Sequence, residues 1–154
     1  MGRVDHVDQK LVKGLVQAGC TQINLGIESG NEDILHELGK GFNIGDVRQA
    51  IQICKDAGLR VKGYFMVGSP GESRRSFNET LALAENLALD VYQFSMFTPY
   101  PGTAVWDRLG MDAAVNRDWT VCDCLYSYAS PGESKSLGVN CSQVSDSELS
   151  VMYS

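Results

Sequence analysis

Glu28 is the residue of this sequence whose position indicates chemistry most directly. It lies next to the end of the apolar segment "TQINLGIES" (21–29), and an ionised carboxylate there must be hydrogen-bonded or face a wet site. Two interpretations remain open. Glu28 either caps a neighbouring helix or pairs with a nearby base, or it accepts hydrogen bonds from a ligand such as the hydroxyls of a ribose.

Two further loops contain Pro-Gly pairs and also follow apolar segments. These are "GSPGE" (68–72) and "TPYPGT" (98–103). Pro-Gly suits the central positions of a type II turn, so both loops at least redirect the chain. Gly63 and Gly68 flank "YFMV" and would let a flat ligand approach the strand backbone.

Metal and phosphate chemistry find little support in the residue pattern. Neither G-x-x-x-x-G-K-[ST] nor G-x-G-x-x-G occurs in the sequence. His6 and His36 are far apart, and Cys122-x-Cys124 is the only close thiol pair. We therefore expect no metal ligands in this chain, and the role of Cys122 and Cys124 stays open.

Alternating helices and strands must position these loops. Apolar spacing predicts helices at 8–18, from the cap Asn43 to Gly58, and after the cap Ser73. It predicts strands at 21–29, 60–68 and 91–97. The inner face of the third helix is predicted from its spacing: Phe77, Leu81, Ala84 and Ala88.

This order predicts an α/β fold with a parallel sheet, because each crossover helix returns the next strand in the same direction. The carboxyl ends of the strands, and hence the three loops, then meet at one edge. Three strands are too few to close a barrel. We predict an α/β unit at residues 1–109 and an irregular, Ser-rich tail at 110–154, in which "SELSVMYS" begins a helix at the end of the chain.

Composition narrows the possible partners and compartment. The 154 residues carry a net charge of −6, and the basic residues are scattered, so nucleic acid and anionic membranes are not expected partners. No apolar stretch is long enough to span a membrane. Five cysteines without a dense spacing favour reduced thiols and a cytoplasmic location.

Three segments, in this order and spacing, resemble the C-terminal half of the radical S-adenosylmethionine (SAM) domain. They are "AGCTQINLGIESGNEDIL", "GFNIGDVRQAIQICKDAGLRVKGYFMVGSPGES" and "FSMFTPYPGTAVW". The resemblance covers residues 4–109 and is greatest to the branch of iron–sulfur oxidoreductases and oxidative cyclases often fused to a cobalamin-binding domain. It implies a (β/α)6 partial TIM barrel, of which this chain supplies the last three strands.

The resemblance also implies an enzyme that cleaves SAM reductively to a 5′-deoxyadenosyl radical at a 4Fe-4S cluster. The family holds this cluster with C-x-x-x-C-x-x-C, a spacing that this sequence lacks. Cluster binding is therefore expected upstream, and the chain alone is expected to be inactive. The parent protein could also carry cobalamin. The alternative is a non-catalytic α/β binding or interaction module derived from such a domain.

The resemblance assigns site residues to the ends of the three strands, and none of them is catalytic or a metal ligand. Glu28 and Ser29 would lie near the ribose and methionine parts of SAM. The fifth-strand segment of the family would pack on adenine and offer it backbone hydrogen bonds: Met66, Val67 and Gly68. The sixth strand end would face the substrate: Thr98, Tyr100 and Thr103.

The expected partner of this chain is the N-terminal half of its own barrel. Without it, residues 21–28 are expected to form an exposed sheet edge. We expect the chain to self-associate through that edge or to cover the edge with its own tail.

Overall fold

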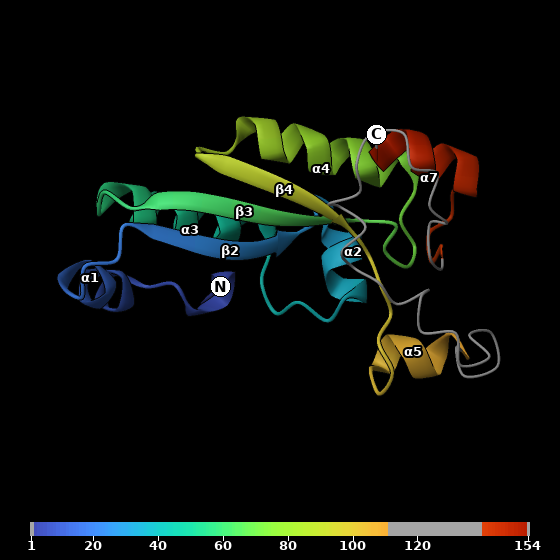
Figure 1. Cartoon of the computed structure of the whole chain (residues 1–154), viewed down its shortest axis with the longest axis horizontal. Coiled ribbons are helices and arrows are strands. Elements are labelled where there is room, and N and C mark those ends of the chain that lie inside the picture. Colours follow the sequence, from blue (N-terminus) through green and yellow to red (C-terminus); the bar gives the residue numbers. More distant parts are fainter. Residues whose placement is uncertain (1, 111–139, 154) are drawn as a thin grey trace.

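Three apolar segments form the strands β2 (Gln22–Glu28), β3 (Arg60–Val67) and β4 (Val91–Met96) of one parallel sheet, as predicted. A short strand, β1 (Gly2–Arg3), pairs with β2. The computed structural model describes residues 2–110 and 140–153, and Figure 1 shows its strands side by side with a helix behind them. The strand order β1-β2-β3-β4 brings all carboxyl ends to one edge.

The three helices predicted from apolar spacing are present as α1 (Gln9–Gln17), α3 (Ile44–Asp56) and α4 (Arg74–Asn86). Side-chain caps fix where they begin. Before α3, the Asn43 side chain accepts the backbone N–H of Asp46, and the Asp46 carboxylate accepts the N–H of Asn43. This reciprocal pair satisfies two amides that have no partner within the helix.

Four shorter helical segments complete the described chain. The 3-10 helix η1 (Val4–His6), α2 (Glu32–Glu37) and α5 (Ala104–Arg108) span too few residues to show a helical period in the sequence. The C-terminal segment in which a helix was predicted forms α7 (Asp146–Tyr153). Within the described residues, no helix is long and apolar enough to cross a membrane.

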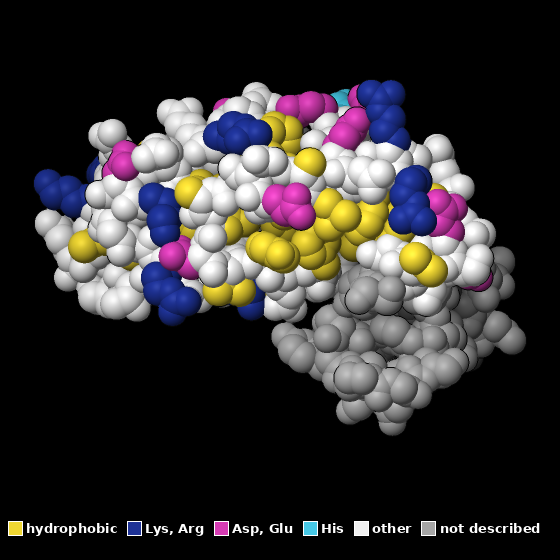
Figure 2. All heavy atoms as spheres, turned by 90° about the horizontal axis from the view of Figure 1, so that it is seen from above, with side chains coloured by type: hydrophobic (Ala, Val, Ile, Leu, Met, Phe, Trp, Pro, Cys, Tyr) yellow, Lys and Arg dark blue, Asp and Glu magenta, His cyan; other side chains and the backbone are white. Residues whose placement is uncertain are grey.

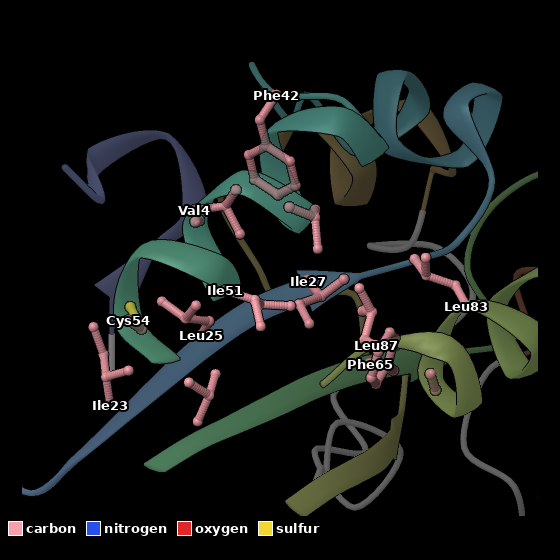
Figure 3. Packing of buried hydrophobic residues seen from close by; sticks show 14 of the residues in the cluster. Val4, Ile23, Leu25, Ile27, Phe42, Ile51, Cys54, Phe65, Leu83 and Leu87 are labelled. Carbon is pink, nitrogen blue, oxygen red and sulfur yellow. The ribbon is translucent and has the colours of Figure 1, made fainter. Parts of the chain in front are cut away.

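The main hydrophobic core lies between α3 and β2. Figure 3 shows Ile51 and Cys54 of α3 directed toward the side chains of Ile23, Leu25 and Ile27 on the strand. All five are buried. Removing this much apolar surface from water is what holds the helix on the sheet.

The predicted inner face of α4 is partly wrong. Phe77 and Ala84 are buried as predicted, but Leu81 is 36% exposed and the helix ends before Ala88. Thr80 is buried on the inner face instead. A polar residue takes this position because its hydroxyl bonds the loop after β2, a contact that apolar spacing cannot predict.

A second, smaller core joins α7 to the ends of β3 and β4. Leu149 and Met152 of α7 pack with Val67, Phe77 and Met96. The described end of the C-terminal segment is therefore a packed helix. The proposed domain boundary after residue 109 stays a prediction.

The three long strands alternate between a face covered by helices and a face that the described helices leave uncovered. On the covered face, Leu25 and Phe65 are buried, whereas their neighbours in sequence are half-buried or exposed. We call the uncovered side the polar face. Its residues are Gln22, Asn24 and Gly26 of β2, Arg60, Lys62, Tyr64 and Met66 of β3, and Val91, Gln93 and Ser95 of β4.

The outer edges of the sheet differ from the expectation. Residues 21–28 were expected to form a bare edge, but the two-residue strand β1 pairs with Leu25 and Gly26 of this segment. At the other edge, Val91 and Tyr92 of β4 are 38% and 54% exposed. Figure 2 shows hydrophobic side chains gathered on the side that carries β4 and α4. Self-association stays a prediction, and β4 is the edge with exposed apolar surface.

Candidate functional site

The carboxyl edge of the sheet holds a cleft of about 210 Å³, which we call the edge cleft. It forms where the loop after α2 and the segment after β4 meet the end of β3. Parallel α/β proteins bind ligands at this edge, because the loops there vary while the sheet holds them in place. Its lining residues are Leu38, Lys40, Met66, Phe97, Thr98, Pro99, Tyr100, Thr103 and Val105.

Glu28 sits at this edge in an unusual backbone conformation. Its φ is 72°, the only positive φ of a non-glycine residue among the described residues. The N–H of Ser29 donates to the C=O of Ile27 at 3.0 Å, which makes Glu28 the centre of a γ-turn. A side chain in the left-handed region is strained by about 1–3 kcal/mol, and such strain clusters at functional sites.

The γ-turn directs the Glu28 carboxylate back over the polar face. A Cβ placed on Gly26 would lie 2.7 Å from Glu28 Oε1, so glycine leaves room for the carboxylate. Lys40 Nζ donates to the same oxygen at 2.9 Å. The side chains of Glu28 and Lys40 are 16% and 23% exposed, so most of the pair is shielded from water. The interpretation that Glu28 pairs with a nearby base thus holds in this structure, and its role as a ligand contact stays a prediction.

Ser29 faces away from the edge cleft. Its side chain is buried, and its hydroxyl lies 3.1 Å from Thr80 Oγ1 on α4. The N–H of Gly30 donates to the same Thr80 oxygen at 2.9 Å. Asn31 extends this contact by donating to Glu79 at 2.6 Å, and it also caps α2. Ser29 therefore fastens the loop to α4.

The loop after β3 is built around Glu72. This side chain is fully buried, and one carboxylate oxygen accepts the N–H of Gly68. Within the described part of the chain, the other carboxylate oxygen and the Ser69 hydroxyl have no hydrogen-bond partner. Burial raises the pKa of Glu72 to about 7, against the opposing effect of hydrogen bonds from the Gly68 and Ser69 amides.

Only part of the segment predicted to contact adenine, Met66 to Gly68, is open to a ligand. The Gly68 N–H is bonded to Glu72, and the Val67 C=O accepts the N–H of Phe97 at 2.7 Å. The Val67 side chain is buried in the second core. Met66 is the member of this segment whose side chain lines the edge cleft.

The predicted substrate-side residues come together, with Thr98, Tyr100 and Thr103 all lining the edge cleft. The Thr103 hydroxyl also has a structural role. It donates to the C=O of Tyr100 at 2.7 Å and accepts the N–H of Trp106, which caps α5.

The structure therefore gathers Met66 and the three substrate-side residues around one cleft, and Glu28 is joined to it through Lys40. Ser29, Val67 and Gly68 do not line the cleft. It adds two residues that the sequence analysis missed. Lys40 is twelve residues from Glu28 in a loop, so no periodicity connects them. Glu72 could have been found from its place after Pro-Gly, where a carboxylate is close to free backbone amides.

Metal ligands are not gathered in this part of the chain. In residues 2–110 and 140–153, no group of three or more His, Cys, Asp or Glu side chains could hold a metal ion. Cys20 and Cys54 are free thiols. Cys122 and Cys124 lie outside the described residues. The described residues thus do not offer the set of ligands that an iron–sulfur cluster needs.

Comparison with known proteins agrees with this geometry. Residues 2–84, more than half of the chain, match the family described as the Radical SAM superfamily. This chain belongs to the radical SAM superfamily. The cofactors of this family are SAM and a 4Fe-4S cluster, as the resemblance implied.

Relatives and solved structures support the same family and fold. The chain is 36% identical over 105 residues to an uncharacterised methyltransferase of Pyrococcus horikoshii, covering 68% of this chain and 23% of the relative. It is 30% identical over 103 residues to the anaerobic magnesium-protoporphyrin IX monomethyl ester cyclase of Rubrivivax gelatinosus, covering 67% and 19%. The chain thus spans about a quarter or less of these radical SAM relatives.

Among solved structures, the radical SAM methyltransferase TsrM of Kitasatospora setae, with cobalamin and a 4Fe-4S cluster bound, superposes with a TM-score of 0.65. Its sequence is 19% identical, and the match covers 73% of this chain and 22% of TsrM. Escherichia coli coproporphyrinogen III oxidase superposes with a TM-score of 0.55 at 12% identity, over 75% and 31%. These matches confirm the α/β radical SAM fold.

Proposed function

We propose that this chain forms one wall of the SAM site in a radical SAM enzyme, together with part of the substrate site. In the complete enzyme, the bound cofactors supply reductive cleavage of SAM to a 5′-deoxyadenosyl radical. We further propose that the chain alone does not catalyse this reaction, because its described residues do not form a cluster site. Cobalamin in the parent protein is part of the same proposal, supported by the likeness to TsrM.

The observation that supports the proposal most is the Glu28–Lys40 pair beside the edge cleft. SAM carries a carboxylate, an ammonium group, two ribose hydroxyls and a flat purine. Lys40 offers a cation for the carboxylate, and Glu28 offers acceptors for hydroxyl or ammonium donors. Met66 gives the cleft an apolar surface for the purine. The residues present therefore fit SAM in charge and polarity.

The strained backbone at Glu28 is consistent with this role. A glycine at φ 72° would avoid the strain, and the carboxylate is present there instead. A side chain held in such a conformation keeps its position before a ligand arrives. Preorganisation of this kind reduces the entropy lost on binding.

Replacing Glu28 by glutamine tests the proposal. In the full-length protein, Glu28→Gln should weaken SAM binding by more than about fivefold, because each charged hydrogen bond contributes about 1.5–3 kcal/mol. The melting temperature without ligand should change little. Calorimetric titration of SAM and thermal unfolding measure the two quantities.

Glu85→Gln is the matched control, since Glu85 is exposed on α4 and lies outside the cleft lining. It should leave SAM affinity unchanged. If Glu28→Gln instead lowers stability while SAM affinity is unaltered, Glu28 serves only the fold. The non-catalytic binding module is the alternative function, and absence of SAM binding in the wild-type protein would favour it.

A further inference from the structure

Lys62 has unusual neighbours for a half-buried cation. Its Nζ donates to Gln93 Oε1 at 2.8 Å and lies 4.7 Å from the centroid of the Tyr64 ring. Among the described residues, no carboxylate lies within 4.0 Å of it. An ammonium group has three donors, so Gln93 leaves donor capacity on Lys62 unused.

The charge of the polar face differs from that of the whole chain. The chain carries a net charge of −6, yet the polar face contains the cations Arg60 and Lys62. The acid directed onto this face is Glu28, and Lys40 already neutralises it. Among the described residues, Asp90 interacts with Arg60, and the charge around Lys62 is positive, which would attract an anion and raise its local concentration.

The composition of the polar face also differs from that of a packed interior. Closed parallel barrels fill their interior with bulky, branched apolar side chains. Here the corresponding positions include Asn24, Tyr64, Gln93 and Ser95, all half-buried, and the apolar members are Met66 and the exposed Val91. Side chains of this kind line a space that holds water or a polar ligand rather than a dry core.

The distance along β3 relates Lys62 to the edge cleft. Lys62 and Met66 point to the same face four residues apart, which corresponds to about 13 Å. A small molecule of ordinary size can cover this distance, with its reacting part near the edge cleft and a charged group at Lys62.

We propose that the polar face binds the oxyanion group, a carboxylate or a phosphate, of a small-molecule substrate through Lys62. The proposal rests on the proposed function, because it assigns the charged end of the substrate within the same site. Lys62 is a binding and specificity residue in this scheme. Its contact with Gln93 holds the ammonium group in place for the anion.

A purely structural role for Lys62 predicts different behaviour. In that case its hydrogen bond to Gln93 only joins β3 to β4. Substitution would then change stability, whereas the affinity for anions would not depend on this residue.

The experiment titrates inorganic phosphate, benzoate and neutral benzyl alcohol into the full-length protein at constant ionic strength. The variants are Lys62→Gln, Lys62→Arg and Lys13→Gln, in which an exposed lysine of α1 loses the same charge. We expect Lys62→Gln to weaken binding of phosphate or benzoate by about fivefold to tenfold. Lys62→Arg and Lys13→Gln should keep the affinity within about twofold. Preference for phosphate or for benzoate identifies which oxyanion the site takes.

Each outcome bears on the proposal. Equal losses in Lys62→Gln and Lys13→Gln would overturn it, because they reveal only a general charge effect. Absence of binding of both anions to the wild-type protein would overturn it as well, and so would benzyl alcohol binding as tightly as benzoate. SAM affinity is measured on the same samples. If the wild-type protein binds SAM but its anion binding does not depend on Lys62, this inference is refuted and the proposed function remains intact. If the wild-type protein does not bind SAM, the proposed function is refuted.

Discussion

Two glutamates lie at the same edge of the sheet, and their carboxylates have opposite surroundings. Glu28, the last residue of β2, is part-exposed, strained in its backbone and paired with Lys40. Glu72, after β3, is fully buried, has no cationic partner among the described residues and accepts a backbone N–H of its own loop. Their sequence contexts look similar, since each carboxylate precedes a serine and has a glycine within two residues.

The difference shows that a carboxylate at this edge can either contact a ligand or stabilise the fold. Glu28 retains a cation and an open cleft beside it, so a ligand can exchange for its present partner. Glu72 is enclosed, and one of its oxygens is left without a partner. A buried carboxylate without a cation is more stable when protonated, as its raised pKa indicates.

Removing the buried carboxylate should have the largest effect on stability. Glu72→Ala leaves the Gly68 N–H unsatisfied and opens a cavity, so the free energy of unfolding at pH 5 should fall by about 3 kcal/mol. Glu28→Ala should lower it by about 1 kcal/mol or less, because a partly exposed ion pair contributes little. Urea unfolding followed by circular dichroism measures both. Equal losses in the two variants would contradict the contrast between the loops.

The second prediction concerns pH and is specific to Glu72. Its pKa is about 7 in the folded chain and near 4.5 when exposed. The folded state therefore binds more protons between these values, and stability should fall as pH rises from about 4.5 to 7. The size of the fall is about 2–3 kcal/mol, since each pKa unit corresponds to about 1.4 kcal/mol.

Glu72→Gln isolates this effect, because the amide cannot titrate and its oxygen can still accept the Gly68 N–H. The difference in unfolding free energy between wild type and Glu72→Gln should change across this pH range and stay constant above pH 8. Other carboxylates cancel in the difference, including Glu79, whose pKa is lowered by its hydrogen bonds to Asn31 and Arg75. A difference that is flat from pH 4 to 8 would show that Glu72 titrates normally.

The sequence predicted the long elements because they carry regular apolar spacing. The prediction of β3 at 60–68 agrees with Arg60–Val67, and the cap Asn43 marked the start of α3. Short elements such as β1 were not predicted, because two residues contain no period. The inner face of α4 was misassigned at Leu81, since Thr80 is buried through a hydrogen bond rather than through apolar character.

The candidate site was predictable only in part, for a related reason. Glu28 was identified from its place at a strand end, which depends on local sequence. Lys40, its partner, is brought to it by α2 and the following loop. Ser29 and Gly68 were assigned to the site from the resemblance, yet Ser29 is hydrogen-bonded to Thr80 on α4 and Gly68 to Glu72 in its own loop. Which way a loop side chain turns depends on contacts far apart in the sequence.

The smallest expected effect concerns the strained backbone of Glu28. At an ordinary strand position, glycine is less stable than alanine by about 0.5–1 kcal/mol. At φ 72° the order should be reversed, so Glu28→Gly should be more stable than Glu28→Ala by about 1 kcal/mol. Both variants lose the ion pair with Lys40, so that loss cancels in the comparison. The same pair of substitutions at Gln22, at the start of β2, provides the ordinary strand reference.

If alanine is the more stable residue at both positions, the turn at Glu28 relaxes in solution and the carboxylate is not held in advance for a ligand. If glycine is more stable only at residue 28, while both variants bind SAM weakly, the strain accompanies a carboxylate placed for binding.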